Sequence, residues 1–281
     1  MTTFWRDGYR GLLALALIAG LTSTARAEYL KETIALCVQA RGDASIRACT
    51  LVIQNGGMLK HSLAGTYYNR GTARARLRRY AAAKADLDEA IRLRPKFAAA
   101  FYNRGNIFAQ QGRLDRAISD YTNAIRINPD LALAYVNRGI TWSKKKRHDR
   151  AVVDYTKAIE IIPLGPLAFY QRAESRIELR RYKGAIADMS MYIRMRPNDP
   201  AGYFQRGSAL FLARKLSGAH ADFTKAIRIR PDFGAAYIVR AGVSEALGRR
   251  KEAIRDYRTA ARLLPNSAMP KRELKRLGVS P

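Results

Sequence analysis

Residues 98–131 read AAAFYNRGNIFAQQGRLDRAISDYTNAIRINPDL, and this stretch recurs along the 281-residue chain. Its tetrapeptide Tyr-Asn-Arg-Gly at 102–105 returns at 68–71 and, with one change, at 136–139. Prolines keep the same 34-residue spacing, at Pro95, Pro129, Pro163, Pro197, Pro231 and Pro265. A fixed period of this length predicts a repeat protein, in which each unit packs only on its neighbours. The predicted units are 64–97, 98–131, 132–165, 166–199, 200–233 and 234–267.

Within each unit, apolar residues recur at helical spacing in two blocks, which in the reference unit are about 98–110 and 114–127. A short basic or glycine-containing turn separates the blocks, and the closing proline cannot continue the second helix. Neither block shows the alternation of a strand. The pattern therefore predicts a row of helical hairpins.

The residues that repeat also carry a family resemblance. Phe101, Arg104, Gly105 and Phe108, followed by Ala117, Tyr121, Ala124 and Pro129, resemble the tetratricopeptide repeat. The resemblance implies an all-α fold, a right-handed α-solenoid of tandem helix-turn-helix hairpins. Small residues are expected at the helix crossings, in the columns of Gly105, Ala117 and Ala124. Tyr192 interrupts the last column, so the fourth unit is expected to pack less closely or to shift locally.

One departure from the family pattern is an arginine where an apolar residue usually precedes the Gly105 column. It occurs in all six units: Arg70, Arg104, Arg138, Arg172, Arg206 and Arg240. A second unbroken column is acidic: Asp86, Asp120, Asp154, Asp188, Asp222 and Asp256. Because arginines near a helix crossing need partners, we predict a ladder of Arg–Asp ion pairs within or between units. The alternative is that the arginines grip an acidic ligand.

The two cysteines mark a divergent first repeat at 30–63. Counted by the period, Cys37 falls in the Gly105 column and Cys49 in the Ala117 column, where the two helices come closest. We predict a Cys37–Cys49 disulfide that staples an N-terminal capping repeat. Two buried free thiols are the alternative. At the other end, residues 268–281 are predicted to form a capping helix and tail, with a frayed tail as the alternative.

The N-terminal residues 1–27 have the features of a secretory signal peptide. Arg6 and Arg10 precede a short apolar run at 11–21, and Ala25-Arg26-Ala27 is a small-x-small cleavage site. The signal looks bacterial, which predicts export to the periplasm. An uncleaved anchor or a buried helix is the alternative.

The chain is strongly basic, with 51 Lys and Arg against 23 Asp and Glu and a net charge of +28. Such a balance attracts nucleic acid, anionic lipid or acidic protein, and export makes nucleic acid an unexpected partner. The three histidines are not at metal-ligand spacing, and no phosphate loop or nucleophile elbow occurs. We therefore expect no enzyme activity, no cofactor and no metal site.

The family resemblance implies that the first helices of successive units line a concave groove for peptides. The groove residues that it implies combine amides with aromatic rings. They are Tyr68, Asn69, Thr72, Tyr102, Asn103, Asn106, Asn137, Tyr170, Gln171, Phe204 and Gln205. Arg76 and Lys144 lie on the groove side, but a full carboxylate clamp cannot be traced. The alternative is that these are ordinary exposed polar residues.

A column of cations follows the turn between the helices of each unit. This basic edge comprises Arg79, Arg113, Arg147, Arg181, Lys215 and Arg249. It is a candidate surface for anionic lipid, an acidic polymer or an acidic protein, with a solvated face as the alternative. The expected function is a protein-interaction scaffold that binds a peptide or protein in its groove, in an envelope-associated assembly. The alternatives are a basic peripheral protein that binds anions along its edge, and a nucleic-acid binder if the chain is not exported.

Overall fold

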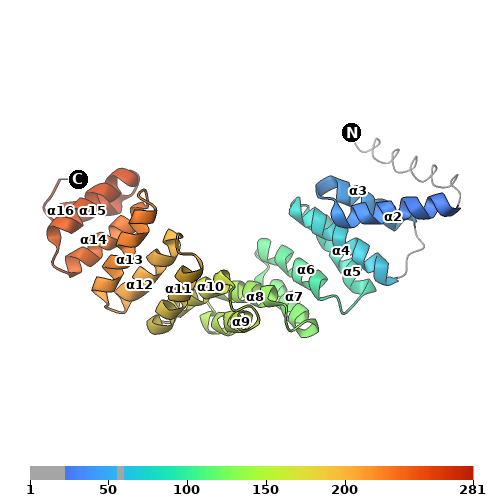
Figure 1. Ribbon diagram of the computed structural model, residues 1–281, viewed down its shortest axis with the longest axis horizontal. Helices are drawn as coiled ribbons and strands as arrows, with labels where there is room; N and C mark the ends of the chain where they lie inside the picture. Colours follow the sequence, from blue (N-terminus) through green and yellow to red (C-terminus); the bar gives the residue numbers. More distant parts are fainter. Residues whose placement is uncertain (1–22, 56–59, 281) are drawn as a thin grey trace. The chain divides into compact units, whose positions relative to one another are not determined.

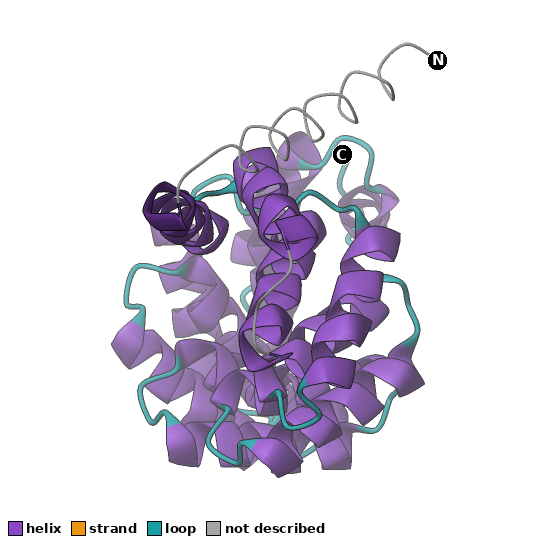
Figure 2. Ribbon diagram, turned by 90° about the vertical axis from the view of Figure 1, so that its right-hand side faces the viewer, coloured by secondary structure: helices purple, strands orange, loops and turns teal. Residues whose placement is uncertain are grey.

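The structure is a computed structural model and describes residues 23–55 and 60–280. Every regular element in these residues is a helix (Figure 2), as the sequence predicts. Residues 1–22 of the predicted signal peptide lie outside the described residues, and helix α2 begins at Ser23.

The helices form consecutive antiparallel hairpins along the chain (Figure 1). The first three pairs are α2 (Ser23–Gln39) with α3 (Gly42–Asn55), α4 (Lys60–Arg76) with α5 (Tyr80–Leu93), and α6 (Ala98–Gln110) with α7 (Leu114–Ile127). The next four are α8 (Ala132–Lys144) with α9 (His148–Ile161), α10 (Pro166–Glu178) with α11 (Tyr182–Met195), α12 (Pro200–Leu212) with α13 (Leu216–Ile229), and α14 (Gly234–Ala246) with α15 (Arg250–Leu263). A short helix, α16 (Ala268–Arg276), follows. The fold is an all-α solenoid of helical hairpins.

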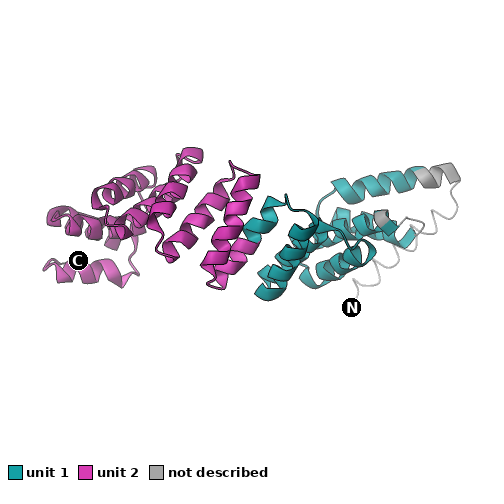
Figure 3. Cartoon of the chain, turned by 90° about the horizontal axis from the view of Figure 1, so that it is seen from below, with its two compact units in different colours: residues 1–137 teal, residues 138–281 magenta. Residues whose placement is uncertain are grey.

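The chain divides into two compact units, residues 1–137 and 138–281 (Figure 3). The division falls within α8. In both units the first helices of neighbouring repeats touch each other, as α4 touches α6 and α10 and α14 touch α12. First helices therefore form one continuous layer within each unit, and this layer carries the predicted groove residues.

A repeated backbone turn links the two helices of each repeat. The second residue after the first helix has a positive φ, and the next amide bonds back to the helix, as Arg113 N–H does to the Phe108 carbonyl at 2.8 Å. Glycine favours this conformation, and it occurs at Gly112 and Gly248. The same position holds a cation in the other four repeats: Arg78, Lys146, Arg180 and Arg214.

Small residues let the two helices of a repeat approach closely. A Cβ atom on Gly105 would lie 2.8 Å from the Tyr121 ring, and one on Gly139 would lie 2.6 Å from the Tyr155 ring. Both contacts are too short, so in these two repeats the ring on the second helix occupies the space that a side chain on the first helix would need. Ala117 and Ala124 are fully buried at the remaining crossings.

Tyr192 does not loosen its repeat in the way that the sequence suggested. Its ring packs 5.2 Å from the Tyr170 ring, and its hydroxyl donates to Asp199. The next repeat has Gly202 where four other repeats have alanine, and a Cβ there would lie 2.8 Å from the Tyr192 ring. The larger side chain is offset by a smaller one across the repeat boundary, which keeps the core filled.

Each end of the array has its own closure. In the first hairpin, Cys37 and Cys49 are joined by a disulfide with a Cα–Cα distance of 4.7 Å, and both residues are buried. At the other end, α16 buries Leu274 completely against the cluster that contains Tyr257. The apolar face of the last repeat is therefore covered.

Candidate functional site

The predicted arginine and aspartate columns meet in every repeat. Each arginine on a first helix donates two or more hydrogen bonds of 2.7–3.2 Å to the aspartate sixteen residues later on the second helix. The six aspartates are only 3–6% exposed. A bidentate pair of this kind satisfies a buried carboxylate, so the columns hold the two helices of a repeat together.

The remaining guanidinium nitrogen reaches into the preceding repeat. Arg104 Nη1 donates to Asp88 at 2.7 Å, Arg172 Nη1 to Thr156 at 3.0 Å, and Arg206 Nη1 to Ser190 at 3.1 Å. Hydrogen bonds to Asp120 and Asp88 raise the pKa of Arg104, against the opposing effect of burial. The donors of these arginines are engaged within the protein, which does not favour the alternative that they grip a ligand.

The last repeat carries no acceptor at the position that receives this third hydrogen bond from a following repeat. Arg240 Nη1 still donates to Thr224 at 3.1 Å, but the position equivalent to Thr224 in the last repeat is Arg258. A further repeat with the same arginine would meet a like charge there. The short helix α16 follows this repeat instead.

The predicted groove residues of the first unit bond to one another across repeats. Asn103 Nδ2 donates to Thr72 Oγ1 of the preceding repeat at 3.0 Å. Asn137 Nδ2 donates to Tyr102 Oη at 3.0 Å and to Asn106 Oδ1 at 2.8 Å. The Tyr121 hydroxyl also donates to Asn106, and burial raises the pKa of Tyr121. These amides fix one first helix against the next.

The second unit repeats this arrangement with a carboxylate at its centre. Gln205 Nε2 donates to Tyr170 Oη at 3.2 Å and to Glu174 Oε1 at 3.1 Å. Gln171 Nε2 donates to Glu174 Oε2 at 3.1 Å. Burial raises the pKa of the Glu174 carboxyl, and the charge of Glu178 adds to the rise, while the two glutamines lower it.

Aromatic side chains of the first-helix layer pack against the second helices and the loops. The ring centroids of Tyr68 and Phe97 lie 4.9 Å apart, and those of Tyr102 and Tyr121 lie 6.0 Å apart. Phe204 contacts both Phe223 and Phe233. Asn69 is half-buried on α4. The predicted residues are thus partly structural, because they are half-buried and hold rigid positions.

Sequence reasoning missed three residues on this layer. Glu174 stands at the position of Asn106, two periods along the chain, so the period itself could have identified it. Leu167 and Leu212 are 50% and 44% exposed on α10 and α12. Exposed apolar side chains beside fixed polar groups are typical of binding surfaces.

The predicted basic edge is exposed at the start of each second helix. Two of its members form ion pairs with the preceding repeat, Arg79 with Asp43 at 2.7 Å and Arg181 with Asp149 at 2.8 Å. Both pairs are about half exposed or more, so each contributes little to stability.

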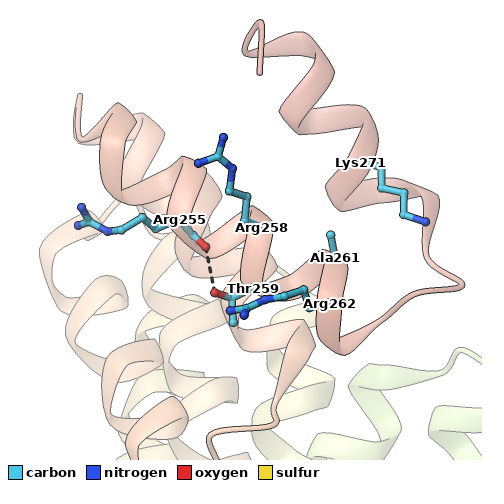
Figure 4. Close-up of a pocket in the computed structure, with 6 residues that line it drawn as sticks. All are labelled: Arg255, Arg258, Thr259, Ala261, Arg262 and Lys271. Carbon is cyan, nitrogen blue, oxygen red and sulfur yellow. Dashed lines mark hydrogen bonds between the residues drawn. The ribbon is translucent and has the colours of Figure 1, made fainter. Parts of the chain in front are cut away.

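A second cationic feature is a cavity of about 700 Å³ at the C-terminal end of the array (Figure 4). Helix α15 contributes Arg255, Arg258 and Arg262, and α16 contributes Lys271. These side chains are exposed. The residues that line the cavity include no acid.

The described residues contain neither a candidate metal site nor a candidate membrane-spanning helix. Among them, no group of three or more His, Cys, Asp or Glu side chains could hold a metal ion. No helix in this part of the chain combines the length and the hydropathy that crossing a membrane requires.

Sequence signatures described as "Tetratricopeptide repeat" match residues 68–132 and 170–232, and another with the same description matches 132–163. Among solved structures, YrrB, described as a TPR protein with an unusual peptide-binding site, is similar with a TM-score of 0.61 and 21% identity, covering 68% of this chain and 97% of that one. PilF from Pseudomonas aeruginosa has a TM-score of 0.63 and 16% identity, covering 77% and 98%. A tetratricopeptide repeat protein from Parabacteroides merdae has a TM-score of 0.60 and 19% identity, covering 89% and 97%. At such identities the likeness shows the fold alone, and no curated protein sequence matches the chain.

Proposed function

Because this chain belongs to the tetratricopeptide repeat family, we propose that it is an exported scaffold that binds a peptide or protein segment along its first-helix layer. The repeats themselves support a protein–protein interaction scaffold. Binding in an envelope-associated assembly follows from the predicted signal at residues 1–27, and YrrB offers a precedent for peptide binding on this fold.

The observation that carries the proposal is the exposure of apolar side chains among fixed polar ones on the first helices. Leu167 and Leu212 reach 50% and 44% exposure on α10 and α12, the helices that carry the hydrogen-bonded Tyr170, Glu174 and Gln205. Because the amides already hold their positions, a bound segment would cost little side-chain entropy on the protein's side.

A photo-crosslinking amino acid placed at Leu212 tests the proposal in cells. We expect it to capture a partner protein, whereas the same group at Val153 captures none. Val153 is a matched control because it is 68% exposed on a second helix of the same unit. Adducts from Val153 with none from Leu212 would contradict binding on the first-helix layer.

The four turn cations with positive φ favour a second candidate, the binding of anionic lipid or an acidic polymer along the basic edge. Arg78, Lys146, Arg180 and Arg214 occupy a backbone conformation that costs about 1–2 kcal/mol for a residue other than glycine. Each directly precedes a residue of the basic edge. Cations at these four strained positions are consistent with a function for their positive charge, such as the binding of an anion.

Vesicle flotation tests this second candidate. We expect the protein to float with vesicles of phosphatidylglycerol and phosphatidylcholine but not with pure phosphatidylcholine, and to lose flotation in the Arg180→Gln, Arg181→Gln variant. Flotation that persists in this variant would contradict a role for the edge.

A nucleic-acid binder is the remaining alternative. It requires the full-length chain to stay in the cytosol, which localisation of a tagged chain tests.

A further inference from the structure

Three first helices of the second unit, α10, α12 and α14, differ in charge from the rest of this basic chain. Helices α10, α12 and α14 contain no lysine. Each of their arginines donates to an aspartate on a second helix: Arg172 and Arg176 to Asp188, Arg206 to Asp222, and Arg240 to Asp256. The other charged residues on these three helices are Glu174, Glu178 and Glu245.

Glu245 is neutralised within the protein, but the other two glutamates are not. Arg276 donates to Glu245 at 2.5 Å, and the Tyr257 hydroxyl donates to its other oxygen. Glu174 accepts hydrogen bonds from the neutral amides of Gln171 and Gln205. Within the residues that the structure describes, neither Glu174 nor Glu178 forms an ion pair, although the chain carries 51 Lys and Arg.

Glu174 and Glu178 lie one turn apart on α10, so their carboxylates repel each other. Burial raises the pKa of Glu174, and this repulsion adds to the rise. Each oxygen of Glu174 already accepts one hydrogen bond from a fixed amide, which leaves a second lone pair on each for another donor. A cation between the two carboxylates would relieve the repulsion and use these lone pairs.

Exposed apolar side chains lie on the same two helices, α10 and α12, that form the layer around the two carboxylates. Leu212 occupies the position of Glu178 one repeat further on, and Leu167 lies two turns before Glu174 on α10. Both leucines are about half exposed, and the rings of Tyr170 and Phe204 are half-buried in the same layer. The layer thus offers negative charge next to apolar surface.

We propose that α10 and α12 bind a segment that carries a Lys or Arg side chain beside apolar residues, with its cation between Glu174 and Glu178. This rests on the proposed function and specifies the chemistry of the partner. The overall charge of the protein opposes such a ligand, whereas unspecific attraction would favour an acidic one. A preference for basic peptides would therefore indicate a local binding site, because the net charge of the protein cannot cause it.

The test selects peptides from a random twelve-residue phage-displayed library on the full chain at about 150 mM salt, where long-range attraction is screened beyond roughly 8 Å. The same selection is made on the Glu174→Gln, Glu178→Gln variant and on Glu160→Gln, an exposed glutamate of the second helix α9. Circular dichroism confirms that the variants fold. We expect basic residues flanked by apolar ones to be enriched on the wild type and on Glu160→Gln but not on the double variant.

A synthetic peptide with the enriched sequence then separates charge from shape. Replacing its arginine by citrulline, or its lysine by glutamine, should weaken binding to the wild type at least tenfold and leave binding to the double variant unchanged. Enriched peptides that are neutral or acidic, and that lose binding in Leu212→Asp, would overturn the cation proposal while the scaffold function stands. Enrichment of no peptide, or of peptides insensitive to Leu212→Asp, would contradict the proposed function itself.

Discussion

At the scale of single residues, the arginine of the ladder joins three helices at once. Arg206 bonds Asp222 in its own repeat and Ser190 in the preceding one, and Asp222 is nearly buried. Removing one partner of such a pair leaves a buried charge without compensation, which costs more than the pair contributes in total.

Arg206→Ala should therefore destabilise α12 and α13 by about 3–5 kcal/mol, because the Asp222 carboxylate keeps its desolvation cost without its partner. Hydrogen exchange of peptides from these helices measures the change. Arg228→Ala, at an exposed position of α13, is the control and should stay within about 0.5 kcal/mol of the wild type. Equal protection in both variants would show that the ladder does not stabilise the repeat.

At the scale of elements, neighbouring repeats pack together through side chains of complementary size at their shared boundary. The pair Tyr192 and Gly202 fills the space that alanine fills on both sides of other boundaries, such as Ala158 with Ala168. The two residues lie on α11 and α12 and depend on each other.

Gly202→Ala should destabilise the second unit by about 1–3 kcal/mol, because the new methyl group would lie 2.8 Å from the Tyr192 ring. Gly218→Ala is the matched control: its nearest neighbour would be Leu210 at 3.4 Å, and a helical glycine replaced by alanine gains about 0.5–1 kcal/mol. Urea unfolding followed by circular dichroism measures both. In a Tyr192→Ala background the cost of Gly202→Ala should vanish, and its persistence would contradict the size compensation.

The first hairpin is the other element with a specific dependence. The Cys37–Cys49 disulfide closes a loop with a sequence separation of 12, and loop closure of this length contributes on the order of 3 kcal/mol. Reduction with dithiothreitol should raise hydrogen exchange in α2 and α3 and leave α12 and α13 unchanged. Two reactive thiols in denatured, unreduced protein from its native compartment would contradict the disulfide.

At the scale of the whole molecule, charged side chains are distributed differently on the first and on the second helices of the repeats. Helices α10, α12 and α14 keep only paired arginines and three glutamates, whereas α15 alone carries five cations, among them Arg255, Arg258 and Arg262. One face is therefore suited to a peptide and the other to solvent or an anion, which allows a strongly basic protein to hold a basic ligand.

The predicted export signal also predicts the residue at which the mature chain begins. If residues 1–27 are a cleaved signal, intact mass spectrometry of protein from the envelope fraction should give a chain that begins at Glu28. Replacing Ala25 and Ala27 by bulky residues should block the cleavage. A cytosolic protein that retains residue 1 or 2 would contradict export and would favour the nucleic-acid alternative.

The amino-acid sequence alone determined the hairpins, the crossing glycines and the columns that pair Arg104 with Asp120. These features follow from local helix propensity and from a 34-residue period that repeats the same contact in each unit. Only the tertiary structure decided the contacts between neighbouring repeats, because these contacts depend on how far one hairpin rotates against the next. That rotation brings Asn137 to Asn106, and Gln205 to Glu174. It also places Gly202 opposite Tyr192 and, among the described residues, leaves Glu174 and Glu178 without an ion pair.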